Sequence, residues 1–240
     1  MNRATNQWGI ELIGNDDDKE RWRVFLKPPF DPFVEEVEHE HGNYLALRSS
    51  GFDGLTTSKE VHDAGKQLFR TLNVVMAKNA DADPIVNSAV IEFVPDGKPR
   101  KHIRIEAEAG MMRLRGGIVE VTVSDSDGNV IEPPPAPSRA QLWMRATDLK
   151  PDIGSALRYM EGKPGWIELY KAYEAIREFP NSGISEKEER RFRQTANTDG
   201  RHHPSPKFPP HEKPMEIWEA RSLITQWISA AIDDVLAKNP

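Results

Sequence analysis

The run Pro133-Pro134-Pro135-Ala136-Pro137-Ser138 constrains the fold of this 240-residue chain more than any other stretch. Prolines lack the backbone N–H donor and hold the chain extended, so neither a helix nor a central strand continues through them. Hydrophobic periodicity also changes here, from alternation before the prolines to helical spacing after them. The sequence therefore predicts an α+β domain over residues 1–132, a proline-rich linker over 133–138 and a helical bundle domain over 139–240.

The N-terminal half combines alternating segments with one long amphipathic stretch. Ser58 is expected to cap a helix in which Val61, Leu68 and Leu72 recur at helical spacing. This helix would pack on an antiparallel sheet with a meander, as in α+β domains. The expected strands cover residues 8–13, 43–48, 88–94, 101–109 and 113–123.

Two acidic stretches in this half admit a structural and a metal-binding interpretation. Asp16-Asp17-Asp18 suits the first turn of a helix that contains Trp22, where acidic side chains are favoured. It could otherwise hold a hard cation. The Asp125–Asn129 run resembles part of a calcium loop, but Ala136 stands at the position of the bidentate glutamate, which favours a hairpin turn.

The C-terminal half is helical in pattern throughout. Pro164 and Pro214 are placed as first-turn prolines, and Ser185 with Glu188 forms a capping box. The expected helices cover residues 138–146, 153–161, 164–176 and 185–195, and a last helix opens at Pro214 and continues through Val235. The last is the longest, and its stripe of Ile224, Trp227, Ala231 and Val235 predicts a central element of the bundle.

Composition excludes several classes of protein. The chain has no cysteine, so disulfides, thiolate metal sites and cysteine nucleophiles are excluded. No run of about 20 apolar residues spans a bilayer and no export signal is visible at the N-terminus, so we expect a cytoplasmic protein without membrane contact. Ten acidic and four basic residues lie between Glu11 and Glu40, and this segment carries the whole net charge of −6. A basic footprint over the whole chain, typical of nucleic-acid binding, is therefore missing.

The residue types best suited to chemistry gather in one short loop between two predicted helices. Arg201 offers a planar donor fork for phosphate, and His202 and His203 could transfer protons. Asn197 and Asp199 could bind a ligand or form Asx-turns at the helix end. Three interpretations stay open for this loop: a helix cap and turn, a phosphate-contacting or acid–base site, and a metal site. We expect no cofactor and no metal, because the histidines lack a familiar ligand spacing.

Two further features flank this loop. Tyr170 belongs to an aromatic face with Trp166 and Tyr173, which predicts a packed core and could alternatively stack nucleobases. The basic run ending at Arg193 is opposed by glutamates, which is typical of a solvated, salt-bridged face. Otherwise it would bind phosphate beside Arg201.

A helical bundle with arginine and histidine in an interhelical loop resembles the HEPN-like domains of prokaryotic toxins and defence proteins. The resemblance covers Ser138 to Pro240 and implies metal-independent RNA cleavage by a dimer that pairs two arginine–histidine sets. In that family a short stretch separates the arginine from the histidine. Here Arg193 lies further from His202, whereas Arg201 is directly adjacent to it. Because of this different spacing, the chain could equally be a relative of the HEPN-like domains that has no catalytic activity.

Two hypotheses of function follow from the sequence. The first is a binding or regulatory module of a bacterial cytoplasmic system, related to defence or toxin–antitoxin pairs and acting through protein or nucleic-acid contacts. Its partner would be another protein or a second copy, bound through the helical domain, with RNA as a further candidate. The alternative is a metal-independent ribonuclease in which Arg201 steadies the phosphate and His202 or His203 moves protons.

Overall fold

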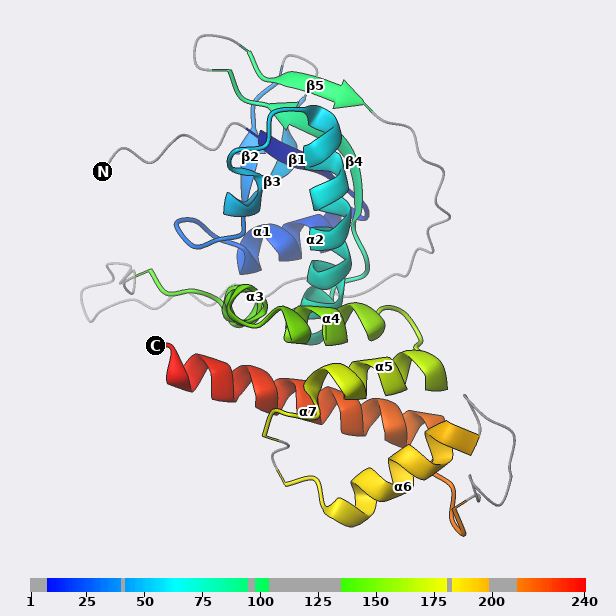
Figure 1. The fold of residues 1–240 in the computed structure, drawn as a ribbon. Coiled ribbons are helices and arrows are strands. Elements are labelled where there is room, and N and C mark those ends of the chain that lie inside the picture. Colours follow the sequence, from blue (N-terminus) through cyan, green and yellow to red (C-terminus); the bar gives the residue numbers. More distant parts are fainter. Residues whose placement is uncertain (1–7, 40–41, 95–97, 104–134, 181–182, 199–210) are drawn as a thin grey trace, which may run out of the picture. The chain divides into compact units, whose positions relative to one another are not determined.

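The computed structural model describes residues 8–39, 42–94, 98–103, 135–180, 183–198 and 211–240. The chain divides into two compact units, Met1–Leu142 and Trp143–Pro240. All described strands belong to the first unit, and the second is helical (Figure 1). The fold is therefore α+β, an antiparallel sheet with packed helices followed by a helical bundle.

The first unit is built on an antiparallel sheet in which five strands are described, in the order β2-β3-β1-β4-β5. Strand β1 lies at the centre because it pairs with both β3 and β4. Strands β4 and β5 form a hairpin, whereas the expected strand over 113–123 lies outside the described residues. The bounds are β1 (Trp8–Ile13), β2 (Phe33–Val37), β3 (Tyr44–Arg48), β4 (Val86–Glu92) and β5 (Arg100–Ile103).

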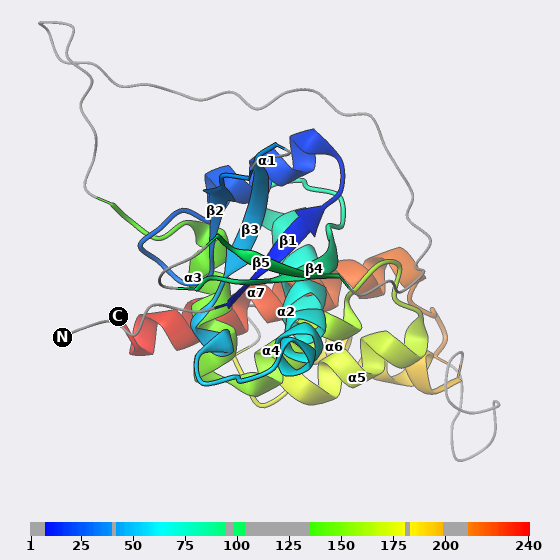
Figure 2. The ribbon, with the colours of Figure 1, turned by 90° about the horizontal axis from the view of Figure 1, so that it is seen from above.

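Helix α2 (Ser58–Asn79) packs along this sheet, beside β4 and β1 in both views (Figures 1 and 2). Its buried face includes Val61, Phe69 and Leu72. Gly65 permits the close approach, because a Cβ there would lie 2.1 Å from Cδ1 of Ile10 on β1. The core of the first unit therefore forms where α2 meets the centre of the sheet.

The two helices of this unit begin at side-chain caps. Asn15 caps α1 (Asp16–Phe25), so the acidic run Asp16-Asp17-Asp18 forms a first helical turn as expected. Thr57, and not Ser58, caps α2: its hydroxyl accepts from the Glu60 amide, and the Glu60 carboxylate accepts from the Thr57 amide. The expected cap was wrong by one residue because only Thr57 has a glutamate three positions later.

Gln141, near the start of α3 (Arg139–Leu149), ties that helix to the chain after α1. Its side chain is 2% exposed, and Nε2 lies 2.8–3.0 Å from the carbonyl oxygens of Lys27, Phe30 and Pro32. Its Oε1 accepts from the Ser138 amide at 3.0 Å. One buried amide thus satisfies backbone groups that would be costly to leave without hydrogen bonds.

The second unit packs its helices around α7 (Ile217–Lys238), which contacts both α4 (Pro151–Tyr159) and α5 (Trp166–Ile176). Helix α6 (Glu186–Ala196) packs on α5. Trp227 is 2% exposed, and its indole donates to the Phe179 carbonyl at 3.1 Å. The prediction that the last helix is central to the bundle, with Ile224, Trp227, Ala231 and Val235 on its buried stripe, is confirmed.

The start of α7 differs from expectation. Pro214 does not open the helix, which begins at Ile217 after the cap Glu216. The reason is that the Met215 amide donates to the Thr195 hydroxyl at 3.0 Å, which holds the chain in a return segment before the helix starts. The Ser185–Glu188 capping box of α6 is confirmed.

Among the described helices, none has both the length and the apolar character that crossing a bilayer requires.

Candidate functional site

The residues with the strongest predicted chemistry, Asp199, Arg201, His202 and His203, lie outside the described residues. The two ends of their loop are described, and so are the other predicted site residues, Asn197, Arg193 and Tyr170. The geometry of the candidate site is therefore built from α6, the return segment 211–216 and the helices that they contact.

Arg191 fastens the end of the loop to the bundle. Its guanidinium donates to the backbone carbonyls of Lys213 and Pro214, both at 2.9 Å. It also binds Glu219 on the first turn of α7 with both terminal nitrogens, at 3.2 and 2.8 Å. A planar guanidinium suits this fork-like arrangement. Arg191 is thus a structural residue that joins α6 to the return segment and α7.

A second tie holds the beginning and the end of the loop close together. Thr195 is fully buried, donates to the Arg191 carbonyl at 2.9 Å and accepts from the Met215 amide at 3.0 Å. Thr198, also buried, donates to the carbonyls of Gln194 and Thr195. The Thr195–Met215 hydrogen bond therefore holds the last turn of α6 against the return segment.

The C-terminal end of α6 and the N-terminal ends of α5 and α7 meet at one end of the second unit (Figure 1). We call this region the loop-bearing end. Arg221 of α7 donates to the carbonyl of Pro164, just before α5, at 3.0 Å and ties the two N-terminal ends together. Two large apolar side chains remain exposed here, Trp218 at 66% and Ile167 at 47%.

The aromatic face of α5 is mainly core. Tyr173 is buried and contacts Trp227 edge-on, with ring centroids 5.4 Å apart. Trp166 and Tyr170 pack on Phe192 of α6, with the Tyr170 ring stacked at 6.4 Å and 16°. The core interpretation is confirmed for Tyr173, while Tyr170 keeps part of its ring at the surface.

A hydrogen bond between α5 and α6 sets the electrostatics of this junction. The Tyr173 hydroxyl donates to Oε1 of Glu189 at 2.6 Å, and Arg193 lies 3.9 Å from the same carboxylate. Burial, followed by the hydrogen bond to Glu189, raises the pKa of the Tyr173 hydroxyl well above its usual value. Tyr173 thus stays protonated near neutral pH and is a structural donor here. Tyr170 and Arg193 are brought to this junction, because both lie next to Tyr173.

Asn197 ends α6 one turn after Arg193, and its backbone amide donates to the Arg193 carbonyl. The helix therefore ends at Ala196, one residue beyond the expected end at Thr195. The structure brings Arg193 and Tyr170 to the α5–α6 junction, whereas Asn197 lies at the end of α6.

Within the ranges that the structure describes, no three His, Asp or Glu side chains gather as a set that could hold a metal ion. Of the acidic stretches considered above, Asp18 has a structural partner, since it accepts from the Asp83 amide at 2.9 Å. The Asp125–Asn129 run lies outside the described residues.

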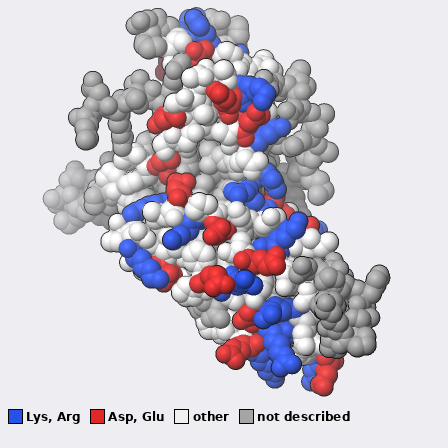
Figure 3. Space-filling view, viewed as in Figure 1, with Lys and Arg blue, Asp and Glu red and all other residues white. Residues whose placement is uncertain are grey.

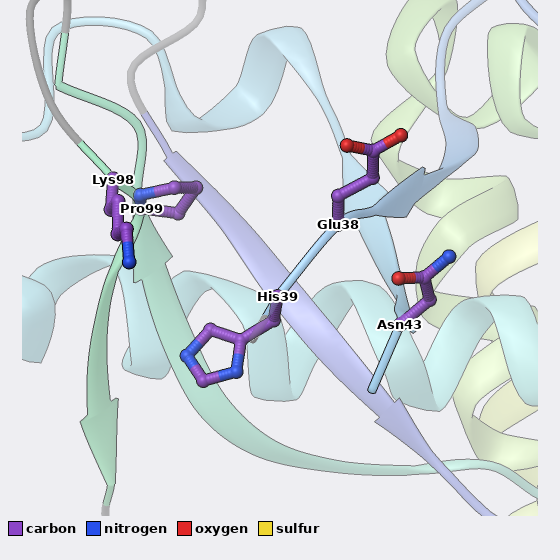
Figure 4. Close-up of a pocket in the computed structure, with 5 residues that line it drawn as sticks. All are labelled: Glu38, His39, Asn43, Lys98 and Pro99. Atoms are coloured by element: carbon purple, nitrogen blue, oxygen red, sulfur yellow. The ribbon is translucent and has the colours of Figure 1, made fainter. Parts of the chain in front are cut away.

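A second candidate is an open hollow of about 410 Å³ in the first unit (Figure 4). Glu38, His39 and Asn43 line it from the β2–β3 side, and Lys98 and Pro99 from the chain before β5. Asn43 already donates to Glu36 at 2.9 Å. Carboxylate, imidazole, amide and ammonium groups together do not select one class of ligand, and this hollow was not anticipated from the sequence.

Sequence reasoning also missed Trp218, although a signal was available. In a helix of 3.6 residues per turn, the stripe Ile224–Trp227–Ala231–Val235 places Trp218 outside the buried face. A tryptophan on the exposed side of an amphipathic helix is a candidate contact residue, because tryptophan is enriched at protein interfaces.

Comparisons with known proteins identify no relative: no family model, no curated protein and no solved structure matches this chain.

Proposed function

We propose that this protein is a binding or regulatory module of a bacterial cytoplasmic system, and that its helical unit pairs with another protein chain, in the first instance a second copy. The observation that carries the proposal is the exposure of Trp218 and Ile167, which lie near the N-terminal ends of α7 and α5 at the loop-bearing end. Tryptophan is enriched at the centres of protein interfaces, where burial of its large ring contributes much of the binding energy.

The described polar groups of α6 support a binding role over a catalytic one. Arg191 is engaged by two carbonyls and by Glu219. Glu189 is engaged by Tyr173. These groups stiffen the scaffold, and a rigid scaffold lowers the entropic cost of binding a partner. The resemblance to HEPN-like domains would place such a module among defence or toxin–antitoxin systems.

Sedimentation over a range of protein concentrations tests this proposal. We expect the wild-type chain to self-associate and Trp218→Glu to stay monomeric, with the melting temperature that the wild type has at concentrations where it is monomeric. Leu149→Glu is the matched control, because Leu149 is another exposed apolar residue of the second unit, at 40%. A wild-type protein that stays monomeric at every concentration, or equal behaviour of the two variants, would contradict pairing through Trp218.

The alternative proposal is a metal-independent ribonuclease, favoured by the cationic side chains of α6 that lead towards the loop with His202 and His203. Incubation of the pure protein with mixed RNA in the presence of a chelator tests it. If the loop is catalytic, RNA is cleaved by the wild type, and the double substitution His202→Ala with His203→Ala abolishes cleavage without changing thermal stability. Intact RNA after incubation with the wild type removes this alternative.

A further inference from the structure

Helix α6 contains four basic residues and three glutamates, which gives the helix a formal charge of +1 (4 − 3). Glu188 accepts from the backbone and side chain of Ser185 in the capping box, and these hydrogen bonds lower the pKa of its carboxyl. Glu189 accepts from Tyr173 at 2.6 Å. Two of the three carboxylates thus already accept hydrogen bonds that stabilise the fold.

The four basic residues of α6 differ from one another in their contacts. Arg191 points to the return segment and Glu219. Lys187 and Arg190 are exposed and have no ion-pair partner among the described residues. Arg193 is 54% exposed and lies 3.9 Å from Glu189. Figure 3 shows Lys and Arg side chains gathered over α6.

Lys187, Arg190 and Arg193 follow one another at intervals of three residues. On an α-helix this spacing places neighbouring side chains about one turn apart, in a slanted row along the surface. Three cations in a row outside the core provide successive contacts for a polyanion, and guanidinium groups match phosphate oxygens particularly well.

Tyr170 adds an aromatic ring that packs on Phe192, the residue directly before Arg193 in α6. It is half-buried, stacks on Phe192, and lies beside Tyr173, which Arg193 also approaches. A ring that packs on another side chain and is partly exposed to solvent can stack on a nucleobase. Such stacking requires a base that is not paired. The acidic surplus of the chain lies between residues 11 and 40, far along the sequence from α6.

We propose that Lys187, Arg190 and Arg193 of α6, together with the exposed part of the Tyr170 ring, bind single-stranded nucleic acid, with RNA as the probe to be tested. The cations contact phosphates and the ring stacks a base. This inference deepens the proposed binding function by naming a partner class for the helical unit, but it does not require pairing through Trp218.

Fluorescence anisotropy with a labelled single-stranded RNA tests the proposal on the full chain. In the double variant Lys187→Gln with Arg190→Gln, we expect weaker binding and a salt dependence whose slope, log K against log salt, falls by about 1.4, since each phosphate contact on a single strand contributes about 0.7. Tyr170→Leu should weaken binding about tenfold or more if it removes one stacked base. Glutamine, lysine and arginine have similar helix propensities, so the double variant should fold normally.

Lys238→Gln is the matched control, because Lys238 is an exposed lysine, at 68%, near the other end of α7. It should leave RNA affinity unchanged, and so should Trp218→Glu, which separates this test from the test of pairing. The proposal is overturned if the wild type binds no RNA, if the double variant binds as tightly as the wild type, or if Lys238→Gln weakens binding equally. It is also overturned if polyglutamate binds to the α6 row and RNA does not, because the partner would then be an acidic protein segment.

Discussion

Tyr173 and Glu189 share a hydrogen bond of 2.6 Å that joins α5 to α6 inside the helical unit. The donor is buried against Trp227 and Phe192, whereas the acceptor carboxyl group of Glu189 is partly exposed. Since Tyr173 must keep its proton to donate, the junction between the two helices depends on pH, and its strength can be measured.

The pH dependence has a defined sign. Burial and the Glu189 carboxylate raise the pKa of Tyr173 in the folded state, whereas a tyrosine in the unfolded chain ionises near pH 10. Above about pH 10 the unfolded state loses a proton that the folded state keeps, so the stabilising contribution of Tyr173, complete at lower pH, is progressively lost. Urea unfolding at about pH 8 and pH 11 should show a smaller decline for Tyr173→Phe than for the wild type. An equal decline in both proteins would contradict the raised pKa.

The two tryptophans of α7 should respond in opposite ways to substitution. Trp227 is 2% exposed and Trp218 is 66% exposed. Trp227→Ala removes a buried ring and leaves the Phe179 carbonyl without its donor, so the free energy of unfolding should fall by about 3–5 kcal/mol. Trp218→Ala should change it by less than about 0.5 kcal/mol. Chemical denaturation of both variants measures the difference, and similar losses would mean that Trp218 is also packed in the folded monomer.

Arg191 and Arg193 form a second matched pair. Arg191→Ala removes hydrogen bonds to Lys213, Pro214 and Glu219, and should destabilise the protein by about 1–2 kcal/mol, a modest value because both charged groups are partly exposed. Arg193→Ala loses only a 3.9 Å contact and should cost less than about 0.5 kcal/mol. Hydrogen exchange should also accelerate at residues 211–216 in the Arg191 variant alone. Unchanged exchange there would show that Thr195 anchors the return segment without help.

Features that depend on a few neighbouring residues could be predicted from the sequence. The capping box of Ser185 and Glu188 and the buried stripe around Trp227 are local patterns, and both are confirmed. The edge strand β2 was missed, because Pro32 directly precedes it and Glu35 and Glu36 interrupt the alternation. Its strand conformation comes from pairing with β3, which is a tertiary effect.

At the candidate site, too, contacts that depend on tertiary packing could not be predicted from the sequence. The sequence predicted that Tyr170 and Arg193 could belong to one site, and the structure brings them to one junction. It could not indicate that Glu188 and Glu189 serve the cap and Tyr173, because these partners are chosen by packing between helices. Glu188 and Glu189 are therefore engaged in contacts of the fold, whereas Lys187 and Arg190 stay exposed.

Gly65 offers the sharpest test of the packing between α2 and the sheet. A Cβ at this position would lie 2.1 Å from Cδ1 of Ile10, but 3.6 Å from its Cγ1. Alanine normally stabilises a helix by about 1 kcal/mol relative to glycine. Here we expect Gly65→Ala to destabilise the protein by about 1–3 kcal/mol, because Ile10 is fully buried and has little room to move.

Ile10→Val removes the clashing Cδ1 and alone should cost about 0.5–1.5 kcal/mol through the lost buried methyl group. In the double variant the clash is gone and the helix gains alanine, so the combined loss should be smaller than the sum of the two single losses. Denaturation of the four proteins gives the coupling energy between the two positions. Additive losses would show that α2 approaches β1 less closely at Gly65, and the close contact between helix and sheet would then have to lie elsewhere on α2.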